Sequence, residues 1–264
     1  MITYRIDTMQ FTSNCRNIFT QDECSAKPYM SRQKDINQKM RMILVDWIIE
    51  IHVKYKLHAQ TLWLTVNILD RYLERIEVMR ARLQLVGVSA LLIASKHEEI
   101  YPPTVEDCVF VTDDAYTKHE ILAMETLILN LLDYKISVPT GYHFFIRYLN
   151  CIKASENTRH LASYYAERNL QESDMLNVLP HIFSAAAVYA ALHQQNGTIP
   201  GLRTATVWTT ALQEETGCTV KDLEVCARTI IKHVGEDPLT ASRRQLVAAK
   251  RKYSKVSGLQ LPYI

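Results

Sequence analysis

This chain contains few glycines and has no large excess of charge of either sign. The 264 residues include 7 glycines, where average usage would give roughly 18. Sandwiches, barrels and doubly wound sheets usually need more glycine for their turns, so a small number of long helices is favoured. The formal net charge is only +2. That balance excludes a protein whose whole surface binds nucleic acid through a strong positive field.

The sequence also lacks the short motifs that mark common active sites. It has no Gly-x-x-x-x-Gly-Lys-Ser/Thr loop, no Gly-x-Gly-x-x-Gly loop and no Gly-x-Ser-x-Gly turn. None of the six cysteines forms a Cys-x-x-Cys pair, which argues against a zinc ribbon or a thioredoxin-type site. Tyr101 stands where a zinc-protease motif beginning at His97 would need its second histidine. We therefore expect no catalytic residue, no cofactor and no metal site.

Membrane and secretory signals are missing as well. The start of the chain does not read as a signal peptide. The best apolar run, residues 183–192, has about half the length that a membrane helix needs. An intracellular protein with reduced thiols and no membrane partner is therefore expected.

Helical periodicity dominates what is present, so we predict an all-α protein. Two sets of five helices are separated by a boundary near residue 137, with extensions at both ends. The apolar centre of the helix after residue 32 predicts that this helix lies in the middle of its bundle. The motif Thr112-Asp113-Asp114 is expected to cap the helix that follows it. The predicted helices cover residues 32–55, 62–76, 80–98, 105–111 and 116–132, then 140–152, 157–171, 180–195, 203–214 and 219–234, and a last basic helix covers 239–253.

Four sequence motifs in the first half of the chain occur in an order and with a spacing that are specific enough to indicate a family. They are MRMILVDW (Met40–Trp47), LTVNILDRYL (Leu64–Leu73), LQLVG (Leu83–Gly87) and ALLIASKHEEIYPP (Ala90–Pro103). Together they resemble the cyclin box of mitotic A/B-type cyclins, over about residues 28–150. The rest of the chain is compatible with the second, more divergent cyclin fold.

The resemblance implies two tandem five-helix cyclin bundles with an N-terminal helix and a C-terminal helical extension. The expected divisions are 1–30 for the N-terminal helix and linker, 31–136 and 137–236 for the two folds, and 237–264 for the C-terminal helix and tail. It also implies a regulatory subunit, not an enzyme, that activates a cyclin-dependent protein kinase at the G2/M stage. A cyclin of this kind repositions the kinase's C-helix and activation loop, and works in nucleus and cytoplasm. The resemblance does not identify the kinase.

The resemblance further implies a set of kinase-binding residues. Lys96 and Glu125 match the lysine and glutamate through which the family holds the region of the kinase's C-helix, and their donors and acceptors suit exposed backbone groups. The alternative for this pair is that both residues are ordinary surface charges. For the residues after the fifth helix the alternative is packing in the core, and for the N-terminal helix it is packing on the second bundle. The kinase-binding residues are Lys96, Glu125, His97, Glu98, Leu129, Tyr134 and Ile136, with Phe11, Cys15, Ile18 and Phe19 in the N-terminal helix. His97 replaces an aromatic residue found in many members, which leaves the identity of the kinase open.

A second surface is expected on the helix that contains Trp47. This helix carries more apolar residues than one core face can bury, and an exposed apolar patch indicates an interaction site. In the family such a patch docks Arg-x-Leu segments of substrates and inhibitors, with Glu50 pairing the arginine. Core packing is the alternative for the apolar members. The predicted docking patch comprises Met40, Ile43, Leu44, Trp47, Glu50, Leu83 and Gln84.

Two further groups of charges remain. An arginine within an apolar helix needs a partner, and Asp70 matches the family's partner for Arg41, so the two are expected to form a structural ion pair. The basic segment containing Arg243 and Arg251 is expected to have one solvated face, with an import signal or a patch for an acidic partner as alternatives. Two other functions stay open: a cyclin-fold scaffold that activates no kinase, and a DNA-binding protein of the transcription-factor type. An isoelectric point near 8.1 and the kinase-facing motifs argue against the second.

Overall fold

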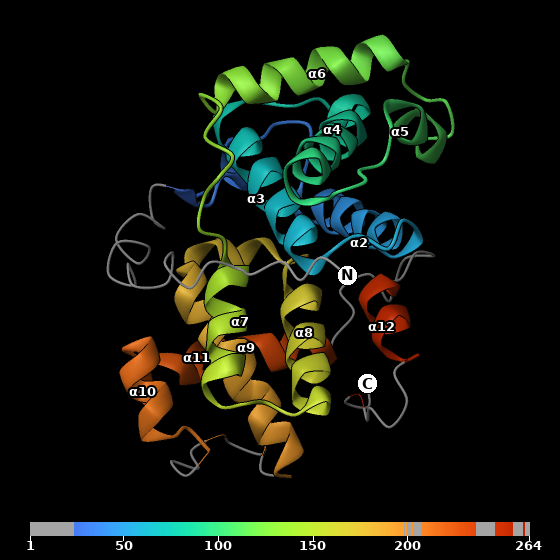
Figure 1. Cartoon of the computed structure of the whole chain (residues 1–264). Coiled ribbons are helices and arrows are strands. Elements are labelled where there is room, and N and C mark those ends of the chain that lie inside the picture. Colours follow the sequence, from blue (N-terminus) through green and yellow to red (C-terminus); the bar gives the residue numbers. More distant parts are fainter. Residues whose placement is uncertain are drawn as a thin grey trace.

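The computed structural model describes residues 24–197, 199, 202, 207–235, 246–255 and 261, and these residues contain helices and no strand. Helices α2 to α6 form one bundle, called the first fold here, and helices α7 to α11 form a second bundle, the second fold (Figure 1). The first fold comprises α2 (Gln38–Lys54), α3 (Ala59–Arg75), α4 (Arg80–Glu98), α5 (Val105–Val111) and α6 (Lys118–Leu131). The second comprises α7 (Gly141–Cys151), α8 (Glu156–Asn169), α9 (Pro180–Gln195), α10 (Thr210–Thr216) and α11 (Val220–Gly235).

Three shorter elements complete the described part of the chain. The 3-10 helices η2 (Met30–Arg32) and η3 (Ser173–Asn177) precede α2 and α9, and α12 (Ala248–Tyr253) follows the second fold. The predicted all-α class and the order of the two sets of helices are confirmed. In the described ranges, no helix combines the length and apolarity that a bilayer span requires. The five cysteines within these ranges are all free thiols.

Helix capping explains where the predicted boundaries were wrong. The helix expected from residue 32 begins at Gln38, because the side chain of Asn37 accepts a hydrogen bond from the backbone N–H of Met40. The helix expected at 116 begins at Lys118, because Thr117 and Glu120 form a capping box. Thr112-Asp113-Asp114 does not cap this helix. Both aspartates have positive φ values, 55° and 57°, and form the turn before it.

The later helices show the same kind of shift. The helix expected at 203–214 is α10, which begins at Thr210 after the side chain of Thr209 caps it. The described part of the last basic helix covers only residues 248–253.

The helix at the centre of the first fold is α4, not α2 as the apolar pattern suggested. Helix α4 contacts α2, α3, α5 and α6, and it is buried from Leu83 to Ser95 except at Gln84. Helix α2 is apolar on most faces for a different reason. It contacts α3 and α4 on one side, and η3 and α12 on the other.

The second fold is built around α9, which contacts α7, α8, α10 and α11. Helix α9 is rich in buried alanine, which lets neighbouring backbones approach closely, and large rings such as Tyr165 and Trp208 fill the remaining space. The two folds meet at Trp63 of α3, whose ring lies 5.7 Å from Phe145 of α7 and 5.7 Å from Phe183 of α9, measured between ring centroids. An aromatic cluster therefore joins the two hydrophobic cores into one.

Candidate functional site

Lys96 and Glu125 form an ion pair across two helices of the first fold. Lys96 lies in the last turn of α4 and Glu125 lies in the middle of α6. The Lys96 Nζ lies 2.8 Å from Oε1 and 2.9 Å from Oε2 of Glu125. The lysine side chain is 45% exposed and the glutamate 12%. The pair thus holds a defined ammonium group at the surface, with hydrogen-bonding capacity left for a partner.

Large apolar side chains lie in the segments that follow these two helices. Ile100 and Tyr101, which come directly after α4, are exposed, and Tyr101 is 91% exposed. Tyr134, which comes after α6, is also exposed and has a positive φ of 56°. Such a conformation is unusual for a bulky residue. Ile100 and Tyr101 were missed in the sequence. An apolar pair between a helix end and two prolines was the available signal.

The remaining predicted kinase-binding residues divide by exposure. His97 is exposed and lies 3.8 Å from Glu98, between His97 Nε2 and Glu98 Oε1, while Glu98 and Leu129 are half-buried. Ile136 is only 7% exposed and belongs to the hydrophobic core. This burial fits the core-packing alternative for Ile136, and its contact with a kinase stays a prediction. Phe11, Cys15, Ile18 and Phe19 lie outside the described residues.

The predicted docking patch contains an exposed layer and a buried layer. Met40, Ile43 and Trp47 on α2 and Gln84 on α4 are half-buried, and Glu50 is exposed. Leu44 and Leu83 are buried, which fits the core-packing alternative for these two residues, and their contact with a docked ligand stays a prediction. Leu44 packs against Gly87, where a Cβ atom would lie 2.7 Å from Leu44 Cδ1. The buried layer therefore supports the exposed one and fixes its position.

The predicted ion pair between Arg41 and Asp70 is present in the structure. Arg41 Nε donates to Asp70 Oδ1 and Nη2 to Oδ2, both at 2.7 Å, and both side chains are buried. Tyr29 donates its hydroxyl proton to Asp70 Oδ1 at 2.7 Å. Burial, followed by the Asp70 charge, raises the pKa of Tyr29 well above its ordinary value. Burial alone would lower the pKa of Arg41, but the Asp70 carboxylate outweighs it and the net shift is upward.

Arg41 also links the two folds, which the sequence did not reveal. Its Nη1 donates to the backbone carbonyls of Leu170 at 3.2 Å and Gln171 at 2.8 Å, both in the segment between α8 and η3. Backbone carbonyls leave no mark in a sequence, since every residue carries one. The Arg41–Asp70 pair is therefore a joint between the folds as well as a support within the first.

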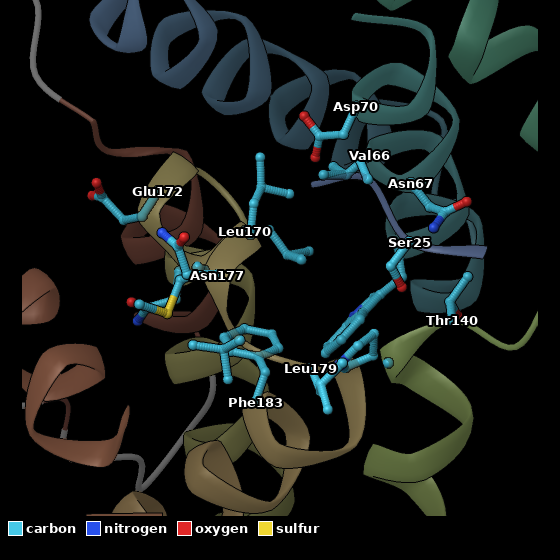
Figure 2. Close-up of a pocket in the computed structure, with 18 of the residues that line it drawn as sticks. Ser25, Val66, Asn67, Asp70, Thr140, Leu170, Glu172, Asn177, Leu179 and Phe183 are labelled. Carbon is cyan, nitrogen blue, oxygen red and sulfur yellow. The ribbon is translucent and has the colours of Figure 1, made fainter. Parts of the chain in front are cut away.

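A cavity of about 320 Å³ lies beside this joint. Figure 2 shows Asp70, Val66 and Asn67 on one side and Leu170, Glu172 and Phe183 on the other. Its walls are mostly apolar, and its polar groups are largely occupied. Asp70 pairs with Arg41, Asn67 Nδ2 donates to the carbonyl of Cys24, and Glu172 accepts from Arg168. The cavity therefore marks an imperfectly filled junction between the folds.

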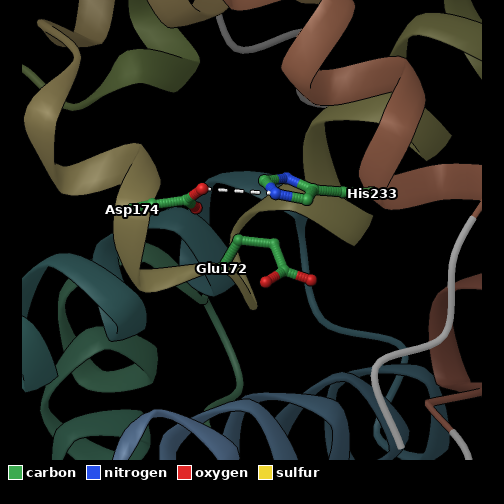
Figure 3. Close-up of side chains that lie close together, drawn as sticks. All are labelled: Glu172, Asp174 and His233. Carbon is green, nitrogen blue, oxygen red and sulfur yellow. Dashed lines mark ion pairs between the residues drawn. The ribbon is translucent and has the colours of Figure 1, made fainter.

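Three side chains near this junction could approach a metal ion. Glu172, Asp174 and His233 each offer a ligand atom, and these atoms lie within 4.8 Å of one another. Figure 3 shows the ion pair between His233 Nε2 and Asp174 Oδ2, which are 3.3 Å apart. Glu172 Oε1 accepts from Arg168 Nη1 at 2.6 Å. Protein groups thus already pair both carboxylates, and this group carries no metal assignment.

Comparisons with known proteins agree over most of the chain. The family model "Cyclin, N-terminal domain" matches residues 13–137, and "Cyclin, C-terminal domain" matches residues 139–260. The chain is 37% identical to Cyclin-B1-5 of Oryza sativa subsp. japonica, over 95% of this chain and 54% of that protein. It is 37% identical to G2/mitotic-specific cyclin-A of Drosophila melanogaster, over 95% of this chain and 49% of that protein. The chain spans about half the length of the curated relatives it matches.

Solved structures share the fold at lower sequence identity. A viral cyclin from herpesvirus saimiri superposes with a TM-score of 0.71 at 22% identity, covering 84% of this chain and 96% of the viral chain. A chain of the yeast RNA polymerase II CTD kinase CTDK-1 complex superposes with a TM-score of 0.61 at 14% identity, covering 94% of this chain and 84% of that chain. Both support two tandem bundles of the observed kind.

Proposed function

This chain belongs to the cyclin family, and from that membership we propose that it is the non-catalytic regulatory subunit of a cyclin-dependent Ser/Thr protein kinase. The proposal includes a role at the G2/M stage and work in both nucleus and cytoplasm. The similarity to B-type and A-type cyclins supports the stage. The family resemblance alone motivates the location.

The observation that carries the proposal is the surface ion pair of Lys96 and Glu125. The pair brings an ammonium and a carboxylate together at one place on the first fold. An ammonium with three donors and a carboxylate with two acceptor oxygens can bind the exposed carbonyls and amides of a partner's backbone. The exposed residues Ile100, Tyr101 and Tyr134 supply apolar area for the same interface.

The mechanism we propose is a shift of the kinase between two conformations. Phosphoryl transfer by a protein kinase requires an ion pair between a strand lysine and a glutamate on its C-helix. A cyclin that binds the conformation containing this pair more tightly than the inactive one raises the active population. Moving a kinase from 1% to 99% active takes a difference in affinity of about 10⁴-fold. A large interface is needed for that, and the ion pair supplies only part of it.

The docking patch on α2 adds recruitment of substrates to this role. Glu50 is exposed and can pair with the arginine of an Arg-x-Leu segment. Met40, Ile43 and Trp47 keep part of their apolar surface accessible for the leucine. A substrate held on this patch has a higher effective concentration at the kinase's active site.

The test is activation of cyclin-dependent kinase subunits by the purified chain, measured as phosphorylation of a Ser/Thr-Pro substrate. The informative variant is Lys96→Ala/Glu125→Ala, which removes both charges and so leaves neither unpaired at a buried position. Glu106→Ala/Lys118→Ala is the matched control, because it removes an exposed ion pair between α5 and α6.

We expect strong activation by the wild type and by the control, and at least tenfold weaker activation by the Lys96/Glu125 variant. Kinase binding without activation would support a scaffold instead. If no kinase subunit binds, the proposal is wrong, and binding to duplex DNA at physiological salt becomes the alternative to measure.

A further inference from the structure

The C-terminal segment of this chain lies beside the proposed docking patch. Helix α12 contacts α2 and α8, and it lies beside them in Figure 1. Leu246, just before α12, forms a small buried cluster with Met42 of α2, and Ile43 of α2 packs against this cluster. Arg251 of α12 places its Nη1 3.4 Å from Glu50 Oε1. The C-terminal segment therefore contacts residues of α2 that lie about 200 positions earlier in the chain.

These two contacts fall on residues that the docking patch would use. Ile43 and Glu50 are seven residues apart, so they lie on the same stripe of α2 about 10 Å apart. Ile43, an apolar member of the patch, packs against the cluster formed by Leu246 and Met42. Arg251 pairs with Glu50, the only carboxylate of the patch. A leucine of the chain itself thus lies beside the apolar part of the patch, and an arginine of the chain occupies the position that the arginine of an Arg-x-Leu ligand would take.

We propose that this C-terminal segment is an intramolecular competitor of docking ligands, with Arg251 holding the carboxylate that a ligand's arginine needs. The inference rests on the proposed docking function of the patch. A ligand arginine must displace Arg251 from Glu50, so the wild-type chain binds such ligands more weakly than its patch allows. Arg251 therefore sets the affinity of docking and selects for ligands with a second strong anchor.

The competing contact can open without release of the helix. The backbone N–H of Ala248 donates to the buried Asp46 at 3.0 Å. Lys252 Nζ lies 2.7 and 2.8 Å from the two carboxylate oxygens of Glu167, and the Tyr253 hydroxyl donates to the same carboxylate at 2.8 Å. These bonds anchor α12 at both of its ends. Only the Arg251 side chain has to move.

The ion pair that anchors α12 is more buried than the ion pair that competes with ligands. The side chain of Lys252 is 20% exposed and pairs with a buried glutamate, whereas Arg251 is 70% exposed and Glu50 45%. Exposed ion pairs contribute little stability, while a buried carboxylate that loses its partner is costly. A ligand therefore exchanges with Arg251 at low cost, and the expected gain in affinity from removing Arg251 is about two- to fivefold.

The experiment measures the dissociation constant of a labelled Arg-x-Leu peptide by fluorescence polarisation, using the full chain. Arg251→Ala is compared with the wild type and with Lys250→Ala. Lys250 is exposed and carries the same charge on the same helix, so it is the matched control for general electrostatic effects. A second peptide with alanine in place of its arginine tests whether the gain depends on that residue.

We expect Arg251→Ala to tighten binding two- to fivefold, Lys250→Ala to change it by less than 1.5-fold, and the alanine peptide to show no gain. Glu50→Gln should remove the difference between the Arg251 variant and the wild type. An unchanged dissociation constant in Arg251→Ala, or an equal gain in Lys250→Ala, overturns the competition while leaving the docking function intact. If neither the wild type nor Arg251→Ala binds the peptide, the docking function itself is wrong and the competition falls with it.

Discussion

The first and second folds are both five-helix bundles, but they differ in how many large apolar side chains they expose. Among the large apolar side chains exposed in the described part of the chain, all but Leu179 and Val225 belong to the first fold. The exposed residues of the first fold include Ile100, Tyr101, Phe110 and Tyr134. Exposed apolar surface is costly unless a partner covers it. The difference supports the proposal that the first fold carries the binding surfaces.

The cores of the two folds differ in a related way. The central helix of the first fold, α4, buries leucine, valine and isoleucine, while the central helix of the second, α9, buries alanine against rings such as Tyr165 and Trp208. The two cores are joined by the rings around Trp63 and by the bonds of Arg41. We infer that the folds unfold together, so damage to the joint should destabilise both.

The largest effect on this joint is expected from Asp70→Ala. The substitution leaves the Arg41 guanidinium buried without its carboxylate, which costs about 3–5 kcal/mol of unfolding free energy. Tyr29 also loses its acceptor. Urea denaturation, followed by circular dichroism, measures the loss, and kinase binding should weaken as a consequence.

Lys34→Ala is the control for this prediction, because it breaks an exposed pair with Glu77 and should cost less than about 1 kcal/mol. Equal melting temperatures for the wild type and Asp70→Ala would contradict the structural role of the pair.

Acid should destabilise the first fold through His52 of α2. Its Nε2 lies 3.0 Å from the carbonyl of His58, and burial, followed by the charge of Lys252, lowers its pKa to about 4. The unfolded chain therefore binds a proton between about pH 6.5 and pH 4 that the folded chain does not. Stability is greatest above this range and falls by roughly 3 kcal/mol as the pH drops through it.

His52→Gln should flatten this slope, measured as urea midpoints between pH 7 and pH 4. Part of the slope should remain, because burial also lowers the pKa of His143 and His181 in the second fold. An unchanged pH dependence in the variant would show that His52 is not the main acid-sensitive group.

A smaller effect is expected from Gly141→Ala, which sharpens the comparison by acting between the folds. A Cβ atom at Gly141 would lie 2.5 Å from Cζ3 of Trp63, inside the aromatic cluster. Overpacking of this kind costs about 1–3 kcal/mol. The matched variant is Gly87→Ala, whose Cβ would meet the flexible side chain of Leu44 within the first fold. A larger loss of unfolding free energy in Gly87→Ala than in Gly141→Ala would contradict a rigid joint.

The sequence predicted the bounds of several helices correctly, but it did not predict which helix lies at the centre of the first fold. Periodicity located α4 and α9 at their observed bounds, because long apolar stripes leave little choice, and the short helix α5 was also predicted at its observed bounds. It assigned the centre of the first fold to α2, since apolar residues that face α12 and η3 look like residues that face a bundle core.

The positions of the predicted site residues in the fold could be predicted from the sequence only in part. The motif placed Lys96 and Glu125, and the structure pairs them, with the Lys96 side chain 45% exposed in the last turn of α4 and the Glu125 side chain 12% exposed in the middle of α6. Ile136, Leu44 and Leu83 matched the motif but are buried, which depends on packing that one sequence does not record. Arg251 had no motif at all, since its contact with Glu50 depends on how the chain returns to α2.

The measurement that tests the central claim most directly is kinase activation by the charge-swapped variant Lys96→Glu/Glu125→Lys. The swap keeps an ion pair between α4 and α6, so the melting temperature should stay near that of the wild type. It reverses the donor and acceptor that the surface offers to a kinase. We predict that the concentration needed for half-maximal activation rises about ten- to hundredfold, since hydrogen bonds to charged groups contribute about 1.5–3 kcal/mol each. A folded swapped variant that activates the kinase as well as the wild type would contradict the account.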